Sequence, residues 1–472
     1  MYPRIEWLLL TLIVILVVLL AATSTADSIR AALGEVHVKH IKNGGNSTAT
    51  LDELVNILTT RSSGETKTTY IREFRHNYER TQPLDPWITL DDIPAEIPYQ
   101  PGLTFYKTSV HIGQRKLFMN EVQFCTRVTR DIIPAEFQNT PHKYLVVYVG
   151  SAPSNKGALL AKLFPSIKFI FVDPNTFDIY TKGLAPSIKV WSGYKKRNTA
   201  DECDDIVRQI SDSDFQINII NDLMTMNLAR AISTHYPSNY FISDIRTNAW
   251  DDIPDAIDIL WNNAQQLNWM MVINPVLSML KFRHPFYTQS NTSFYEASQR
   301  EPLRSDFEMA KANGVDFIGN YAKRTLEYFD GTEYLQPWAP ISSTESRLVT
   351  DGKKFKKYGD PSGYDNRYLY YNAIGRTYVM FKNPFASKKL GFDHCSDCAL
   401  ECNIWMQYIK STGGRVEAQI IHDFVSELSR YTKRTLLVNG HGSMFSRPSP
   451  SAVLAKIKNH QPYKPKKKYT YK

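Results

Sequence analysis

Cysteine is scarce in this sequence, and the few cysteines do not form the pattern of a disulfide framework. Only 5 of the 472 residues are cysteine, and three of these lie close together. Secreted domains that depend on disulfides carry denser, even-numbered sets. The sequence therefore excludes a disulfide-stabilised scaffold and favours a reducing compartment. The five cysteines are Cys125, Cys203, Cys395, Cys398 and Cys402.

A strong excess of either charge is also missing. The 56 Lys and Arg residues against 47 Asp and Glu give a net charge of +9, and part of this excess lies in a basic tail, residues 441–472. Such a balance is compatible with an RNA or phosphate-bearing partner without pointing to one. The hydrophobic share of 43% is ordinary for a globular protein with a buried core. Internal repeats are absent as well.

One uncharged apolar run, residues 7–22, stands at the N-terminus. It is slightly short of the ~20 residues that span a bilayer and slightly long for the core of a signal peptide. We expect residues 1–26 to form an uncleaved transmembrane anchor that leaves the rest of the chain in the cytosol, given the distribution of flanking basic residues. A cleaved signal segment is the alternative, and it would make the sequons at Asn46 and Asn291 meaningful.

The rest of the chain divides into an extension and one domain. Residues 27–96 alternate polar clusters with short apolar stretches, which predicts a linker or N-terminal extension with one helix over 50–60. After Lys143, apolar β-branched runs alternate with helical patterns, which predicts a Rossmann-like α/β fold: a mostly parallel sheet with helices on both faces, in a domain over 97–440. Strands are expected at 144–149, 167–172, 240–244 and 269–273, with helices at 156–163 and from about Asp251.

Gly150, Asp173, Asp244 and Asn274 follow the four expected strands. Ligands bind outside the carboxyl ends of such strands. Gly150 lets the backbone approach a ligand closely, and Asp173 can accept hydrogen bonds from the ribose of an adenosine-containing cofactor. The G-x-G-x-x-G fingerprint is absent, so a nicotinamide enzyme is disfavoured. An ordinary strand-turn-helix with a capping aspartate is the simpler alternative.

The amino-acid sequence around Gly150 is more specific than a glycine turn followed by one acid. Residues 146–153, Val-Val-Tyr-Val-Gly-Ser-Ala-Pro, resemble the cofactor loop of poxvirus-type cap-specific mRNA (nucleoside-2′-O-)-methyltransferases, a family that doubles as the small, regulatory subunit of poly(A) polymerase. The resemblance covers about residues 97–439 and implies an S-adenosylmethionine-dependent methyltransferase fold. Four further blocks match in the same order, at 113–117, 242–246, 274–286 and 335–347.

The family uses a Lys-Asp-Lys-Glu tetrad, whose matching residues are Lys116, Asp244, Lys281 and Glu345. A ribose 2′-hydroxyl is a poor nucleophile and needs a positioned base. The resemblance implies that Lys281 is this base, with a pKa lowered by Lys116 and by the sulfonium of the cofactor. Asp244 would orient the Lys281 ammonium, and Glu345 would hold both lysines. Taken singly, each residue has a plainer interpretation as a surface charge or a helix cap.

The resemblance also implies a set of cofactor-binding residues and two departures from the family pattern. Ser154 stands where the family favours glycine, and Asn175 stands where it favours arginine. A side chain at Ser154 is expected to hinder the close approach of the backbone to the methionine end of the cofactor. The expected cofactor-binding residues are Tyr148, Gly150, Ala152, Pro153 and Asp173.

Recognition of the RNA cap is implied in the same way. Methylated guanine is cationic, so it stacks between aromatic rings while an acid accepts hydrogen bonds from its ring N–H groups. Phe286 and Tyr99 match the two rings, and Asp365 matches the acid. Ser342 and Thr288 replace an aromatic residue and an acid of the family pattern, which predicts looser cap selectivity. Ordinary core packing is the alternative for Phe286.

His394 and the neighbouring cysteines are residue types that bind metal ions, so we considered a metal site there. Spacings of three and seven place Cys395, Cys398 and Cys402 on one face of a helix, whereas zinc sites more usually pair two separated knuckles. The pattern therefore predicts buried cysteines on a helix and no metal.

We predict from these patterns a viral, membrane-anchored mRNA cap-specific 2′-O-methyltransferase that uses S-adenosyl-L-methionine and binds capped mRNA. It would act on the first transcribed nucleotide. The leading alternative is a non-catalytic, RNA-binding processivity subunit for a poly(A) polymerase catalytic subunit. A third is a secreted or virion-surface protein that keeps the fold without the chemistry, which would require cleavage near Ala26 or glycosylation at Asn46.

Overall fold

The structure, a computed structural model, describes Tyr99 and most of residues 110–431. The predicted N-terminal anchor, the linker with its helix over 50–60, and the basic tail all lie outside the described residues. The gaps within the described part are 134–139, 142, 180, 182–185, 192–198, 248–253, 288, 341–342, 360, 373–382 and 393–395.

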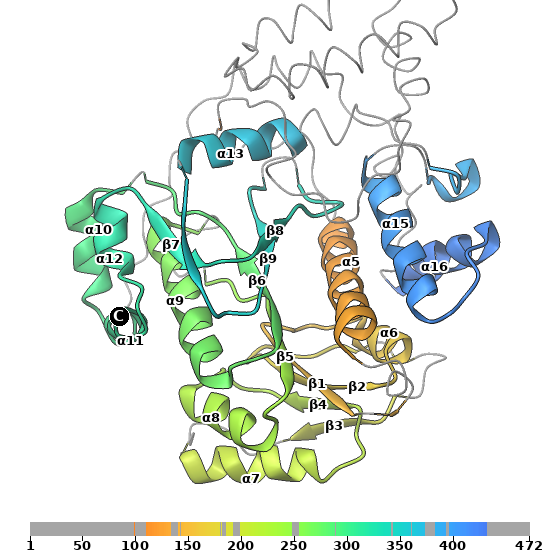
Figure 1. Ribbon diagram of the computed structural model, residues 1–472, viewed down its shortest axis with the longest axis horizontal. Coiled ribbons are helices and arrows are strands. Elements are labelled where there is room, and N and C mark those ends of the chain that lie inside the picture. Colours follow the sequence, from red (N-terminus) through yellow and green to blue (C-terminus); the bar gives the residue numbers. More distant parts are fainter. Residues whose placement is uncertain are drawn as a thin grey trace, which may run out of the picture.

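An eight-stranded sheet runs through the centre of the domain (Figure 1). Its order is β3-β4-β2-β1-β5-β6-β9-β8; the first six strands are parallel, and β9 and β8 continue it in antiparallel pairing. The strands are β1 (Tyr144–Val149), β2 (Ile167–Val172), β3 (Ile188–Trp191), β4 (Ile217–Ile220), β5 (Asn239–Ser243), β6 (Leu277–Phe282), β8 (Thr332–Tyr334) and β9 (Ser346–Thr350). A separate two-stranded sheet pairs β7 (Leu326–Phe329) with β10 (Phe355–Tyr358).

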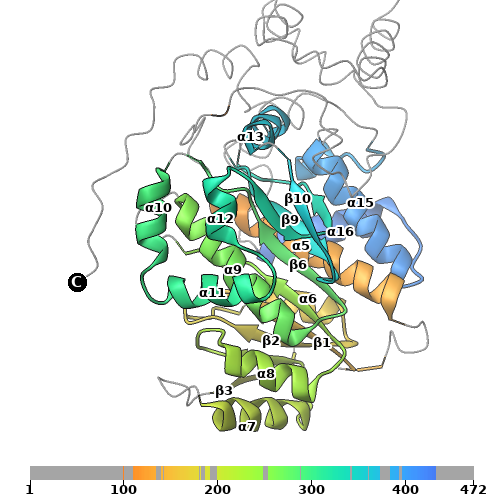
Figure 2. The same cartoon turned by 60° about the vertical axis from the view of Figure 1, so that its left-hand side comes forward.

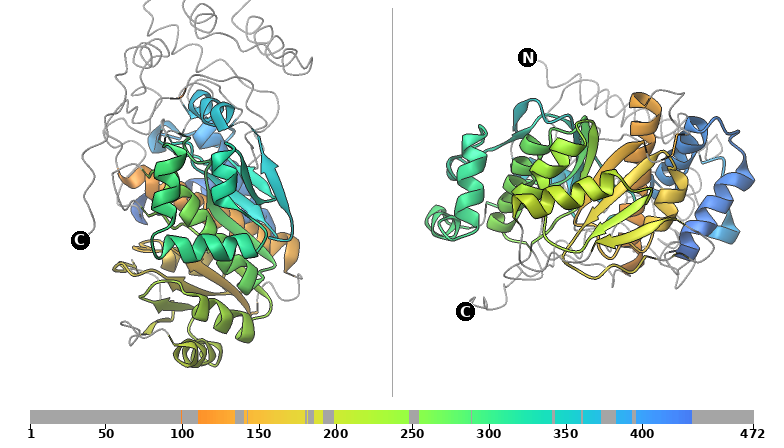
Figure 3. Two further views of the ribbon diagram at one scale, coloured as in Figure 1. Left: turned by 90° about the vertical axis from the view of Figure 1, so that its left-hand side faces the viewer. Right: turned by 90° about the horizontal axis from the view of Figure 1, so that it is seen from below.

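Two layers of helices cover the sheet, as the alternation of strands and helices predicts. Val146 and Tyr148 of β1 pack with helices of one layer, namely α5 (Val110–Arg127), α6 (Gly157–Leu163) and α15 (Ser396–Ser411). Leu145 and Val147 pack with helices of the other layer, namely α7 (Ala200–Ser211), α8 (Met226–His235) and α9 (Ala256–Ile273). Figures 2 and 3 show α5, α15 and α16 (Ala418–Tyr431) on one side of the sheet. On the other side α9 lies with α10 (Asn291–Ser298), α11 (Leu303–Ala312) and α12 (Phe317–Ala322). Because both faces are covered, β1 and β2 are buried along almost their whole length instead of alternating between buried and exposed residues.

The helix bounds complete the architecture. The α-helices are α5 (Val110–Arg127), α6 (Gly157–Leu163), α7 (Ala200–Ser211), α8 (Met226–His235), α9 (Ala256–Ile273), α10 (Asn291–Ser298), α11 (Leu303–Ala312), α12 (Phe317–Ala322), α13 (Pro361–Tyr370), α15 (Ser396–Ser411) and α16 (Ala418–Tyr431). A π-helical turn (Val128–Ile132) follows α5, and a 3-10 turn covers Lys388–Leu390.

The prediction of a strand at 269–273 is wrong. These residues are the last turns of the 18-residue helix α9, and the fourth predicted strand, β6, begins at Leu277. Since α9 is buried on most of its circumference, its end is a short continuous apolar run, which cannot be distinguished from a buried strand by periodicity. Asn274 is the left-handed residue that ends α9, so it lies at the amino edge of the sheet and not at the ligand-binding edge.

The predicted fold class needs a second correction, because it included a transmembrane segment. Within the part of the chain that the structure describes, no helix is both long and apolar enough to cross a membrane. The observed fold is a mixed α/β domain with a mostly parallel, Rossmann-like sheet.

The strand order brings the predicted site together. From β1 the sheet grows to one side through β2, and to the other through β5 and β6, so the order of strands reverses beside β1. Ligands of open α/β sheets bind at the carboxyl ends of strands on either side of such a reversal. Gly150 and Asp244 follow β1 and β5 at this edge, and Asp173 follows β2.

Candidate active site

Gly150 makes the turn that opens the site. Its φ of +75° belongs to the left-handed region, and a Cβ there would lie 2.8 Å from the backbone nitrogen of Ile245 and 2.9 Å from the carbonyl carbon of Asp244. Any larger residue would push apart the segments that follow β1 and β5. This glycine is therefore required by a close approach of two backbones as well as by its own conformation.

Asp173 holds the loop after Gly150 in place. Its Oδ2 accepts a hydrogen bond from the backbone nitrogen of Ala152 (3.1 Å), and its Oδ1 accepts from the backbone and side-chain nitrogens of Asn175 (2.8 and 2.9 Å). Asn175, one of the two departures from the family pattern, thus supports the acid. The other departure, Ser154, has a φ of +48°, a conformation that costs about 1–2 kcal/mol in a residue other than glycine.

The loop fits an adenosine-containing cofactor. The Oγ of Ser151 is buried and makes no hydrogen bond within the described part of the chain, so it is available to a ligand. Each Asp173 oxygen also keeps acceptor capacity for a ribose hydroxyl. Tyr148 is buried, and its hydroxyl donates to Glu121 Oε1 at 2.9 Å, which fixes its ring against α5.

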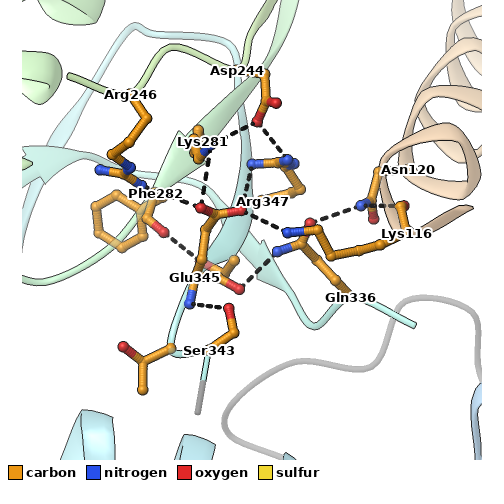
Figure 4. A network of polar contacts seen from close by, with 12 residues as sticks. Lys116, Asn120, Asp244, Arg246, Lys281, Phe282, Gln336, Ser343, Glu345 and Arg347 are labelled. Atoms are coloured by element: carbon orange, nitrogen blue, oxygen red, sulfur yellow. Dashed lines mark hydrogen bonds and ion pairs between the residues drawn. The ribbon is translucent and has the colours of Figure 1, made fainter. Parts of the chain in front are cut away.

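A compact group of charged side chains lies beside this loop (Figure 4). Lys281 Nζ is 3.3 Å from both Asp244 Oδ1 and Glu345 Oε2, and Lys116 Nζ is 3.0 Å from Glu345 Oε1. The structure thus brings the four residues of the predicted tetrad together, each with a side chain no more than 16% exposed. We call the following six residues the charge cluster: Lys116, Asp244, Arg246, Lys281, Glu345 and Arg347.

The four tetrad members of the charge cluster come from four separate segments of the sequence. Lys116 lies on α5, Asp244 follows β5, and Lys281 is the penultimate residue of β6. The antiparallel pairing of β9 with β6 sets Arg347 opposite Lys281 and places Glu345 just before β9 begins. Such a meeting of distant segments depends on the sheet, not on local sequence.

Two arginines of the charge cluster were not among the predicted site residues. Arg347 Nη2 is 2.6 Å from Asp244 Oδ1, and Arg347 Nη1 is 3.4 Å from Glu345 Oε1. Arg246 Nη2 lies 3.4 Å from Glu345 Oε2. Both arginines stand two residues after a predicted acid and inside a matching block, which is the signal that could have identified them.

The electrostatics of the charge cluster are dominated by mutual pairing. Burial raises the pKa of Glu345, but the attraction of Lys116, Lys281 and the arginines outweighs it and holds this pKa well below its usual value. The pKa of Asp244 is lowered by the same competition, with Arg347 the strongest partner. Burial lowers the pKa of Lys116, and Glu345 opposes the shift only in part. Both carboxylates are therefore ionised at neutral pH.

The predicted cap residues also lie together. The rings of Tyr99 and Phe286 are stacked with centroids 5.8 Å apart, less than the ~7 Å that a third flat ring between them would need. The guanidinium carbon of Arg283 lies 3.3 Å from the Phe286 ring centroid, and its Nη2 is 3.4 Å from Asp365 Oδ1. Thr288 and Ser342 lie outside the described residues.

The predicted helical cysteines are found as expected, apart from Cys395, which lies outside the described residues together with His394. Cys398 and Cys402 lie on α15, and both are buried and free of disulfides. Their packing among apolar neighbours is that of small hydrophobic side chains.

Comparisons with known proteins relate the chain to viral RNA-processing proteins. Residues 83–228 and 198–313 match the family model described as the poly(A) polymerase regulatory subunit. Two relatives, the cap-specific mRNA (nucleoside-2′-O-)-methyltransferases of myxoma virus strains Lausanne and Uriarra, are each 25% identical over 326 residues. These matches cover 66% of this chain and 75% of each relative. The chain is thus similar to two viral cap methyltransferases and, over about half of its length, to the model of a poly(A) polymerase regulatory subunit. The resemblance inferred from the sequence motifs is thereby confirmed.

Proposed function

We propose that the protein is an S-adenosylmethionine-dependent, mRNA cap-specific 2′-O-methyltransferase that acts on the ribose of the first transcribed nucleotide. The observation that carries the proposal is the position of Lys281. Its amine lies 3.3 Å from two carboxylates, at the sheet edge where the Gly150 loop begins. Similarity to two viral enzymes of this activity supports the reaction class.

The proposed chemistry requires a base close to the 2′-hydroxyl, and we assign this role to Lys281. Asp244 and Glu345 fix its Nζ from two sides, so that the amine is positioned before substrate binds. Lys116 holds Glu345 from the opposite side, and Arg347 holds Asp244. When bound, S-adenosyl-L-methionine supplies the electrophilic methyl group that the 2′ oxygen attacks.

The charge balance of the cluster suits an RNA substrate. Four cationic side chains surround two carboxylates, which leaves two formal positive charges at a partly exposed site. An RNA backbone supplies phosphates that such an excess attracts. We further propose that Tyr99, Phe286 and Asp365 bind the cap, after the two rings move apart by about 1 Å to admit a base between them.

We assign cofactor binding to the loop that Asp173 organises. Gly150, Ala152 and Pro153 would lie along the cofactor, Asp173 would accept hydrogen bonds from its ribose, and Tyr148 would pack beside the loop. The support for this assignment is the left-handed turn at Gly150, the hydrogen bond from Ala152 to Asp173 and the unpaired Oγ of Ser151.

Methyl transfer from labelled S-adenosylmethionine to capped RNA tests the proposal. We expect Lys281→Ala to lower the rate by about 10²–10⁴-fold, the usual contribution of a general base. Lys311→Ala removes a lysine that is 67% exposed, and it should keep the wild-type rate. Equally low transfer by wild type and Lys281→Ala would contradict the enzymatic proposal.

Cap selectivity is tested by comparing capped with uncapped RNA of the same sequence. Wild type should prefer the capped RNA, and Phe286→Ala should lose most of this preference. An unchanged preference in Phe286→Ala would show that the ring only packs against its neighbours.

A second function is supported by the family match. The matching model describes a regulatory subunit of poly(A) polymerase, and it covers the segment from β1 to α11. We propose that the protein also assists a poly(A) polymerase catalytic subunit. Adding the protein to such a subunit should lengthen the tails made in one binding event, and Lys281→Ala should do so equally well. Unchanged tail lengths would contradict this second function.

A further inference from the structure

Lys156 is a buried lysine beside the proposed cofactor loop that the functions above do not use. It precedes α6 directly and is only 3% exposed. Lysine is almost never so deeply buried unless its charge is paired. Within the described residues, however, Lys156 has no carboxylate at ion-pair distance. Its Nζ donates one hydrogen bond, to Gln114 Oε1 at 2.7 Å.

The surroundings of Lys156 are set by α5 and by the ends of two strands. Its Nζ lies 6.0 Å from the ring centroid of Phe118 on α5. Burial lowers the pKa of Lys156, while the negative charges of Glu121 and Asp244 oppose that shift. The ammonium therefore lies against α5, where it contacts Gln114 and faces the ring of Phe118.

Charge compensation of Glu121 is the simplest alternative role for Lys156. Glu121, however, already accepts a hydrogen bond from Tyr148, and the two charged groups are not in contact. Burial also raises the pKa of Glu121, which favours its neutral form. Two donor positions of the Lys156 ammonium thus have no protein partner within the described part of the chain.

We propose that Lys156 binds the carboxylate of the methionine moiety of S-adenosylmethionine, an inference that rests on the proposed function. The carboxylate is the anionic group of this cofactor, and a buried ammonium with free donors is its natural partner. Lys156 belongs to the same turn as Ser154 and Ser151, whose buried Oγ is also unpaired. The methionine end is thus recognised by a charge, at the place where Ser154 replaces the glycine of the family pattern.

Binding of S-adenosylhomocysteine and of its decarboxylated analogue, measured by calorimetry, tests the proposal without catalysis. Wild type should bind the carboxylate-bearing ligand about 10- to 100-fold more tightly, as expected for a hydrogen bond to a charged group. Lys156→Met should bind both ligands alike, with the wild-type affinity for the decarboxylated one. Lys156→Arg should recover part of the preference.

Lys162→Met is the matched control, because Lys162 is exposed on the last turn of the same helix. It should keep the full preference for the carboxylate. A wild-type preference retained in Lys156→Met would overturn the inference, and so would equal binding of both ligands by wild type, which requires no variant to fold. Binding of neither ligand by wild type would instead overturn the proposed function itself.

Discussion

At the scale of single residues, the charge cluster is stable because each buried charge has an opposite charge within reach. Arg347 is the most buried member, with a side chain only 2% exposed, and it bridges the two carboxylates. Removing one partner from such a group leaves an uncompensated buried charge, which costs about 3–5 kcal/mol. The geometry of Lys281 therefore depends on residues that need not touch the substrate.

The depressed pKa of Glu345 predicts a specific dependence of stability on pH. Because the folded-state pKa lies well below the usual 4.5, the unfolded chain takes up the proton first as the pH falls. The stabilisation by Glu345 is complete above about pH 6 and is lost progressively as the pH falls from about 4.5 through the folded-state pKa. Glu345→Gln should lower the free energy of unfolding by about 3 kcal/mol at pH 7, and by less below pH 4.5. Urea unfolding of both proteins across this range measures the difference; a difference independent of pH would contradict the prediction.

Gly150 offers a second test at this scale. Gly150→Ala should destabilise the fold by about 2–4 kcal/mol, since it adds a backbone clash to the cost of a left-handed alanine. Gly413 has a similar φ of +73°, but a Cβ there meets nothing within 4 Å. Gly413→Ala should therefore cost only about 1–2 kcal/mol. Equal losses of unfolding free energy in the two variants would show that the approach to Asp244 is not tight.

At the scale of elements, helix α5 links the site to the outer helical layer. Arg115 donates to both carboxylate oxygens of Glu401 on α15, and both side chains are buried. Glu401 also accepts hydrogen bonds from the indole nitrogens of Trp338 (2.8 Å) and Trp405 (3.2 Å). Since Lys116 is the next residue along α5, this anchor fixes the rotation of the helix that presents it to Glu345.

Breaking the Arg115–Glu401 pair should therefore affect both stability and activity. Arg115→Met alone should lower the free energy of unfolding by about 3–5 kcal/mol, because it leaves Glu401 charged and buried. Adding Glu401→Gln should recover part of this loss. Arg208→Ala breaks a pair whose side chains are about half exposed, and it should change stability by no more than about 0.5 kcal/mol. A double variant that loses the sum of the two single effects would exclude coupling between them.

At the scale of the whole molecule, two apolar cores share one sheet. Neighbouring residues of β1 alternate between these cores, and the site lies at the edge where both end. A ligand that binds this site in the folded chain, and does not bind the unfolded chain, stabilises the whole domain by mass action. S-adenosylhomocysteine at 100 times its dissociation constant should add about 2.7 kcal/mol to the free energy of unfolding.

Thermal unfolding with and without S-adenosylhomocysteine measures this effect. The midpoint temperature should rise by about 2–4 °C for wild type and for Lys311→Ala. Gly150→Ala should show no rise, because the loop that receives the ligand is displaced. An equal rise in Gly150→Ala would place the ligand elsewhere.

Local pattern was sufficient for a large part of this protein. The strands around Tyr148 and Phe169 are short, mostly apolar runs closed by Gly150 and Asp173, and the structure has them at the predicted bounds. The same kind of pattern failed at 269–273, where a helix buried on most sides imitates a strand. Both kinds of segment are buried in the structure, so an apolar run alone does not distinguish them.

The sequence motifs were sufficient to predict the four residues of the tetrad. They did not show that these residues lie in contact. The contacts of Lys281 with Glu345 arise because β9 runs antiparallel to β6, a pairing between segments more than 60 residues apart. The cationic partners Arg246 and Arg347, and the unpaired ammonium of Lys156, likewise emerge only from the packing of distant elements. The sequence by itself determined which residue types stand at each strand end. The tertiary structure decided which charges meet, because charge pairing depends on distances of a few ångströms.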